Sequence, residues 1–143
     1  MTHHGEHKQV RDVMTPNPRT IEPSTPIVEA AKLMRDEDVG PVPIVESGRV
    51  VGILTDRDIA VRVVAEGKDP QSKTAGEVAS KQLVTIDPDQ TIDEAARLMA
   101  QHQVRRLPVC EEDGRLVGIV AQADVALVGA DAQTGEVVQQ ISK

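Results

Sequence analysis

The chain repeats itself. Thr20-Ile21-Glu22-Pro23 returns as Thr85-Ile86-Asp87-Pro88, and Glu29-Ala30-Ala31 returns as Glu94-Ala95-Ala96, in both cases 65 residues further along. Solenoid proteins repeat every ~20 to 50 residues, so this period is too long for their usual units. The duplication therefore predicts two packed copies of one small unit that contains both helices and strands, an α+β fold.

The pattern within each copy predicts the order strand, helix, strand, strand, helix. Thr25 precedes Pro26, which is placed as the first residue of a helix, and a stripe of buried side chains with helical spacing follows. That stripe consists of Ile27, Ala30, Ala31 and Met34, and it returns as Ile92, Ala95, Ala96 and Met99. Apolar runs on both sides of Ser47-Gly48 predict a β-hairpin, and those around Gly114 predict its counterpart. The second helix of the first copy is expected over residues 56–67.

These elements divide the chain into five parts. A polar N-terminal tail precedes the first copy, a polar linker separates the copies, and a helical tail with a break near Gly129 ends the chain. The expected boundaries are a flexible tail at 1–8, repeats at 9–66 and 74–128, a linker at 67–73, and the C-terminal helical tail at 129–143.

Composition excludes several classes of function. The formal net charge of -7 opposes attraction to nucleic acid and to anionic membranes, and the absence of Phe, Tyr and Trp removes the stacking surfaces of single-strand binders. No apolar run approaches the ~18 residues that a membrane span needs, and the N-terminus has no hydrophobic signal region. A single cysteine, Cys110, rules out an intrachain disulfide and falls among apolar neighbours. The sequence thus predicts a cytoplasmic protein without nucleic-acid or membrane partners.

The strongest motif lies at the end of each predicted hairpin. Gly52-Ile53-Leu54-Thr55-Asp56-Arg57-Asp58 returns as Gly118-Ile119-Val120-Ala121-Gln122-Ala123-Asp124, now 66 residues apart. Residues from about Val10 to Ala126 resemble a CBS-domain pair, also called a Bateman module, and the stretch around Asp58 is similar to short stand-alone bacterial CBS proteins of the hypoxia- and stress-response type. The resemblance implies two repeats packed with pseudo-twofold symmetry, a homodimer, and a non-catalytic module that signals to a separate, unknown protein target.

The residue types in this motif suit a nucleotide. The Asp58 carboxylate can accept hydrogen bonds from both hydroxyls of a ribose, each worth roughly 1.5 to 3 kcal/mol, and Thr55 adds a hydroxyl beside it. Arg105 and Arg106 offer planar donors for a phosphate. No cofactor is required, and the expected regulatory ligand is an adenine nucleotide or another adenosyl compound, among which AMP, ADP, ATP, NAD and S-adenosylmethionine are not distinguished.

The resemblance places the ligand in a cleft between the repeats. Its first site would use Ile53, Thr55, Asp58, Leu83, Val84, Val104, Arg105, Arg106 and Pro108. A second, related site would use Ile119 and Asp124, with Arg105 as a further candidate. There Ala121 takes the position of Thr55, and Gly40-Pro41 takes the position of the arginine pair. Unequal occupancy is therefore expected, with the Asp58 site the tighter.

Other interpretations of the same residues remain open. Thr55 and Asp58 have the spacing of an ordinary helix cap, and paired arginines are commonly solvated. The chain could be a structural CBS protein without a ligand, or a metal sensor through His3, His4 and His7, whose imidazoles suit zinc or nickel. An enzyme is not expected, because the sequence shows no nucleophile-base pair and no metal cage.

Overall fold

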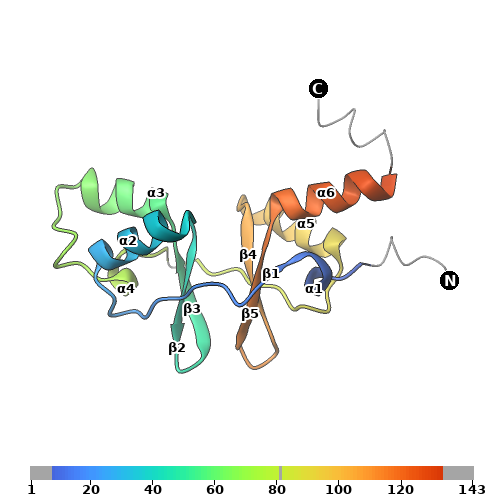
Figure 1. The fold of residues 1–143 in the computed structure, drawn as a ribbon, viewed down its shortest axis with the longest axis horizontal. Helices are drawn as coiled ribbons and strands as arrows, with labels where there is room; N and C mark the ends of the chain where they lie inside the picture. The colour runs from blue at the N-terminus through green and yellow to red at the C-terminus, as the bar shows by residue number, and fades with distance from the viewer. Residues whose placement is uncertain (1–7, 81, 134–143) are drawn as a thin grey trace. The chain divides into compact units, whose positions relative to one another are not determined.

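The structure, a computed structural model, describes residues 8–80 and 82–133. These residues form two compact units. Unit 1 comprises residues 8–16, 84–111 and 117–133, and unit 2 comprises residues 17–80, 82–83 and 112–116. In each unit the helices lie on one side of the strands (Figure 1).

Unit 2 is built around a β-hairpin. Its elements are α2 (Ile27–Glu37), β2 (Val42–Glu46), β3 (Arg49–Leu54), α3 (Asp56–Ile59), the π-helix η1 (Ala60–Val64) and α4 (Ala75–Val78). The hairpin strands are antiparallel, and their turn has positive φ at Ser47 (54°) and Gly48 (81°), the geometry that matches the right-handed twist of the strands. Ile27, Ile44 and Leu54 fill the core of this unit.

Unit 1 contains a sheet of three strands. Its elements are α1 (Val10–Val13), β1 (Thr15–Pro16), α5 (Ile92–His102), β4 (Arg106–Cys110), β5 (Leu116–Ala121) and α6 (Gln122–Gln133). β5 lies between β1 and β4, and β1 pairs with it antiparallel. Leu107, Val109 and Val120 are fully buried in the core of this unit.

The duplication predicted from the sequence is confirmed in the long helices. α2 and α5 each have 11 residues and begin 65 residues apart, and each ends at a residue in the left-handed conformation, Asp38 or Gln103. The predicted start of α2 is one residue early, because Pro26 is extended and precedes the first helical residue. In α5 the hydroxyl of Thr91 caps the helix by accepting a hydrogen bond from Glu94 N at 3.1 Å.

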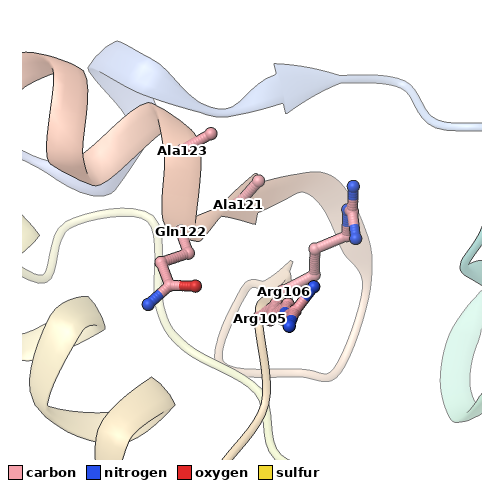
Figure 2. Close-up of a pocket in the computed structure, with 5 residues that line it drawn as sticks. All are labelled: Arg105, Arg106, Ala121, Gln122 and Ala123. Atoms are coloured by element: carbon pink, nitrogen blue, oxygen red, sulfur yellow. The ribbon is translucent and has the colours of Figure 1, made fainter. Parts of the chain in front are cut away.

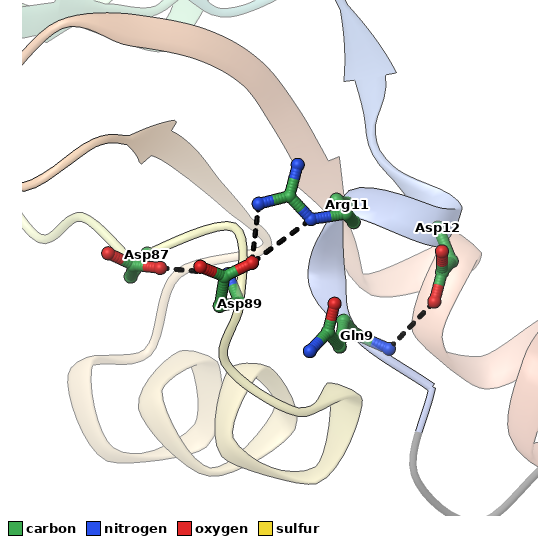
Figure 3. Close-up of polar contacts among 5 residues, drawn as sticks. All are labelled: Gln9, Arg11, Asp12, Asp87 and Asp89. Atoms are coloured by element: carbon green, nitrogen blue, oxygen red, sulfur yellow. Dashed lines mark hydrogen bonds and ion pairs between the residues drawn. The ribbon is translucent and has the colours of Figure 1, made fainter. Parts of the chain in front are cut away.

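Helix α1 packs against the second repeat although it lies at the start of the first repeat in sequence. Val10 is fully buried in the core of unit 1, and its N–H donates to the carbonyl of Gln90 at 2.8 Å. Arg11 donates to Asp89 through Nε at 3.1 Å, and the two side chains form an ion pair (Figure 3). The Val10 bond, with a second bond from the backbone N–H of Arg11 to the carbonyl of Pro88 at 3.0 Å, satisfies N–H groups that a helix start leaves without a partner in its own helix.

Helix α4 has the same relationship to unit 2. The N–H groups of Ala75 and Gly76 donate to the carbonyls of Thr25 and Pro23 at 2.8 and 2.9 Å. Each compact unit thus contains the short first helix of the other sequence repeat. The compact units therefore group the chain differently from the predicted ranges 9–66 and 74–128.

Two predicted helix ends differ from the structure. The helix expected over 56–67 starts at Asp56 but changes to a π-helix that ends at Val64. The helix expected to break near Gly129 continues to Gln133, so that prediction is wrong. A single glycine costs a helix only about 1 kcal/mol relative to alanine, which is compatible with a continuous α6. The predicted restart after Gly135 lies outside the described residues.

Within residues 8–80 and 82–133, no helix is both long and apolar enough to cross a lipid bilayer.

Candidate functional site

In unit 1 a pocket forms where β5 passes into α6. The carbonyl of Arg105, just before β4, accepts a hydrogen bond from Gln122 N at 2.7 Å and thereby holds the start of α6 beside the start of β4. The pocket has a volume of about 300 Å³ and is lined by Arg105, Arg106, Ala121, Gln122 and Ala123 (Figure 2). We call it the arginine pocket.

The arginine pocket carries unpaired positive charge. Both arginines are exposed, and neither forms an ion pair or a side-chain hydrogen bond with the residues that the structure describes. None of the five lining residues is acidic. Two guanidinium groups with free donors, beside the amide of Gln122, can bind an anionic oxygen group such as a phosphate.

Asp124 stands next to this pocket in the first turn of α6. Its Oδ2 accepts a hydrogen bond from the N–H of Ala121 at 3.1 Å. The half-buried carboxylate therefore stays at the junction of β5 and α6, and its Oδ1 accepts no hydrogen bond from the described residues.

The matching junction of unit 2 holds Thr55 and Asp58. Asp58 N donates to the hydroxyl of Thr55 at 3.0 Å, and Thr55 N donates to Asp58 Oδ2 at 3.0 Å. This reciprocal pair is a capping box at the start of α3, so the helix-cap interpretation is correct for both residues. The Thr55 hydroxyl proton and Asp58 Oδ1 have no partner among the described residues, which leaves one donor and one acceptor for a ligand.

The other predicted site residues are divided between the units. Leu83 and Ile53 are half-buried in unit 2. In unit 1, Val84, Val104 and Ile119 are half-buried, whereas Pro108 is buried and its carbonyl accepts a hydrogen bond from Ile86 N at 3.1 Å. The expectation that one ligand touches residues of both repeats stays a prediction.

The sequence interpretation did not select Gln122 as a site residue. The signal was present, because Gln122 aligns with Asp56 at the offset of the repeated motif and replaces a carboxylate with a neutral amide. Its importance depends on the hydrogen bond from its backbone to Arg105, which no local pattern predicts.

The metal site considered from the sequence does not fall among the described residues. Within them, no group of three or more His, Cys, Asp or Glu side chains is placed to hold a metal ion. His3, His4 and His7, the predicted metal ligands, lie outside the described residues. Cys110 is 6% exposed, and burial raises the pKa of its thiol to about 11, as expected for a small buried apolar residue.

Comparison of the sequence with known proteins identifies related chains. A sequence model of the CBS domain matches residues 10–65 and 75–131. CBS domain-containing protein YhcV of Bacillus subtilis is 48% identical over 118 residues, which make up 82% of this chain and 83% of the relative. Hypoxic response protein 1 of Mycobacterium tuberculosis is 42% identical over 117 residues, which make up 81% of each chain.

Solved structures share the fold. A crystal structure of Hypoxic Response Protein I with two coordinated zinc ions has a TM-score of 0.77 at 40% identity and covers 84% of this chain and 98% of the other. The CBS domain pair of protein MJ0100, in complex with 5′-methylthioadenosine and S-adenosyl-L-methionine, has a TM-score of 0.78 at 30% identity and covers 87% and 98%. The repeated helices and hairpins, the family match over both repeats and these relatives show that the chain belongs to the CBS-domain family and contains a pair of CBS domains.

Proposed function

We propose that this chain is a non-catalytic regulatory module that binds an adenine nucleotide. The observation that carries the proposal is the arginine pocket, in which Arg105 and Arg106 have unpaired guanidinium groups and no acidic neighbour lines the space. The adenosyl part of the ligand is supported by the related CBS pair of MJ0100, whose complex contains two adenosyl compounds.

The two kinds of polar group would have different roles. The arginines bind phosphate oxygens through charge-assisted hydrogen bonds, while the free carboxylate oxygens of Asp124 and Asp58 are available for ribose hydroxyls. Binding alone is the expected activity, because the sequence shows no nucleophile-base pair. Because Phe, Tyr and Trp are absent, the adenine ring would pack against aliphatic side chains.

Signalling requires that the ligand change an equilibrium. We expect the chain to act as a cytoplasmic homodimer. The nucleotide should bind one dimer state or partner-binding state more tightly than the other, because a ligand with equal affinity for two states leaves the equilibrium between them unchanged. The protein target is a separate chain whose identity is open. Because a related chain is a hypoxic response protein, stress is the first physiological signal to test for this module.

A thermal-shift panel with AMP, ADP, ATP, NAD and S-adenosylmethionine tests the binding. A nucleotide at 100 times its dissociation constant should stabilise the fold by roughly 2.7 kcal/mol. Removing both guanidinium groups with Arg105→Ala/Arg106→Ala should cost at least about 3 kcal/mol of binding free energy, or roughly 150-fold in Kd. Lys32→Ala/Arg35→Ala is the matched control, because it removes two exposed positive charges from α2.

The panel can also contradict the proposal. If no ligand stabilises the wild type, the chain is a structural CBS protein. If the control and the Arg105/Arg106 variant lose affinity equally, general electrostatic attraction rather than the arginine pocket binds the nucleotide.

Metal binding is a second candidate, because the related Hypoxic Response Protein I structure contains two zinc ions. Zinc titration of the full chain and of a chain without residues 1–7 tests whether His3, His4 and His7 are ligands. Lys8 should be kept, since its carbonyl accepts a hydrogen bond from Ile92 N at 3.2 Å. Equal zinc binding by both chains would exclude these histidines.

A further inference from the structure

A second pocket lies in unit 2, where η1, α4 and the loop that joins them come together. It has a volume of about 200 Å³. Pockets for drug-sized ligands have roughly 300 to 1,000 Å³, so this one suits a smaller molecule. Its lining consists of Arg62, Glu66, Lys68, Lys73, Glu77 and Val78, none of which lines the arginine pocket or belongs to the predicted nucleotide site. We call it the linker pocket.

The helix that supplies Arg62 has an unusual hydrogen-bond pattern. The N–H of Ala65 donates to the carbonyl of Ala60, five residues back, at 2.9 Å, as in a π-helix. Such helices are rare and occur frequently at functional sites. At the repeat offset of 66, the corresponding residues 126–130 lie within the α-helix α6. The π-helix is therefore a feature of the unit that contains the linker pocket.

The charges that this helix and its C-terminal end contribute to the pocket also distinguish the two repeats. At the same offset, Arg62 corresponds to Val128, and Glu66 corresponds to Ala132. The first repeat thus has the π-helix together with a cation and a carboxylate, whereas the second has an α-helix and an apolar residue at each of the two positions. This difference indicates a role for the charges that the shared fold does not require.

Two of the charged groups are held in place by the polypeptide. Arg62 Nη1 donates to the carbonyls of Val78 and Ala79 at 3.2 and 3.5 Å, which fixes the guanidinium at the end of α4. Its Nε and Nη2 donate to none of the described residues. Glu77 Oε1 accepts hydrogen bonds from the N–H and the hydroxyl of Thr74 at 2.9 and 3.1 Å, and these bonds lower the pKa of the carboxyl. The pocket therefore has a preorganised cation and a preorganised anion.

The remaining charges leave the space between these groups open. Lys73 is half-buried, and its ammonium forms no hydrogen bond or ion pair with the residues that the structure describes, Glu77 included. Glu66 and Lys68 pair with each other at 3.0 Å. Cations and carboxylates thus line one space without neutralising each other completely, which suits a small ligand that itself carries both signs of charge.

We propose that the linker pocket binds an α-amino acid with an acidic side chain. The three cations and two carboxylates of the lining give a formal net charge of +1, and such an amino acid has a net charge of -1 at neutral pH. Its carboxylates would bind Arg62 and Lys73, and its ammonium would bind Glu66 and Glu77. The pocket shares no residue with the proposed nucleotide site, so the chain would bind a second class of metabolite there.

An NMR titration of the full chain with L-glutamate tests the proposal and locates the site. The amide signals of residues 60–78 should shift more than those at the junction of β5 and α6. Glutarate has both carboxylates but no ammonium, and it should bind at least about tenfold more weakly. If glutarate binds as tightly as L-glutamate, the pocket attracts anions in general, and the proposal is wrong. It is also wrong if neither L-glutamate nor L-aspartate shifts the amides of residues 60–78.

Lys73→Gln tests the carboxylate contact. Because the ammonium has no partner among the described residues, the variant should fold, and its Kd for L-glutamate should rise at least about tenfold. Lys8→Gln is the matched control, since Lys8 stands 65 residues earlier at the corresponding position and keeps its backbone hydrogen bond with Ile92. The control should stay within about twofold of the wild type. Equal losses in the two variants would show general electrostatic attraction and overturn the proposal.

Glu66→Gln tests the ammonium contact. Glu66 pairs only with Lys68 among the described residues, and such exposed pairs add little to stability, so this variant should also fold. Its Kd for L-glutamate should rise about fivefold or more, while glutarate should bind as tightly as to the wild type or more tightly. If Glu66→Gln weakens both compounds equally or leaves L-glutamate unchanged, the carboxylates of the pocket do not recognise an ammonium, and the proposal is refuted.

Discussion

Replacing Val10 with alanine should destabilise the core that the second repeat forms, although Val10 lies at the start of the first repeat. Val10 is 0% exposed and packs in the same core as Leu107, Val109 and Val120. Val10→Ala removes two buried methyl groups, worth about 0.8 kcal/mol each, and leaves a cavity. We expect a loss of about 2 kcal/mol in the free energy of unfolding and a Tm lower by roughly 5 to 10 °C.

Hydrogen exchange locates the effect. In Val10→Ala the amides of β4 and β5 should lose protection more than those of β2 and β3, since α1 packs in unit 1. Val78→Ala is the matched control, because Val78 lies on the corresponding helix α4, is 5% exposed and packs in the core of unit 2. Its effect should fall on β2 and β3.

Circular dichroism suits the unfolding measurement, because the chain has no Trp or Tyr to report by fluorescence. The reasoning is refuted if Val10→Ala costs less than about 0.5 kcal/mol, the range of ordinary surface substitutions. It is also refuted if the protection lost in Val10→Ala lies in β2 and β3.

Two further predictions concern packing in unit 1. Gly118→Ala should cost about 1 to 3 kcal/mol of unfolding free energy, because its Cβ would lie 2.5 Å from Met14 Sδ. Gly52→Ala should cost less than about 1 kcal/mol, because its Cβ would lie 3.6 Å from the Cδ1 of Ile44, an ordinary contact distance. Urea unfolding compares the two variants, and equal losses would contradict the account. Cys110 should react with iodoacetamide at pH 8 only on unfolding, because burial raises the pKa of its thiol to about 11. The pKa of Cys110 in the folded protein lies above the ordinary value of 9.0, so the contribution of its protonated thiol to the free energy of unfolding is complete below pH 9 and is lost as the pH rises toward 11. Cys110→Ala should abolish that part of the pH dependence of stability.

The local elements follow from the sequence because their causes are local. Helical spacing predicted the buried positions Ile27, Ala30 and Met34 of α2, although Ala31 is only half-buried. Apolar runs on both sides of Ser47-Gly48 predicted the hairpin of unit 2. Comparison of the copies also identified Arg105 and Arg106, which the structure brings together with Gln122 in one pocket.

The arrangement of these elements was decided by contacts between distant segments. The sequence by itself determined a duplicated α+β unit, the long helices, the hairpins and the capping box of Thr55 and Asp58, because each depends on residues a few positions apart. Only the tertiary structure decided that α1 joins unit 1, since the buried side chain of Val10 and the carbonyls of Pro88 and Gln90 select its place. It likewise decided that Gln122 belongs beside Arg105, because the hydrogen bond between their backbones joins residues that no periodic pattern relates.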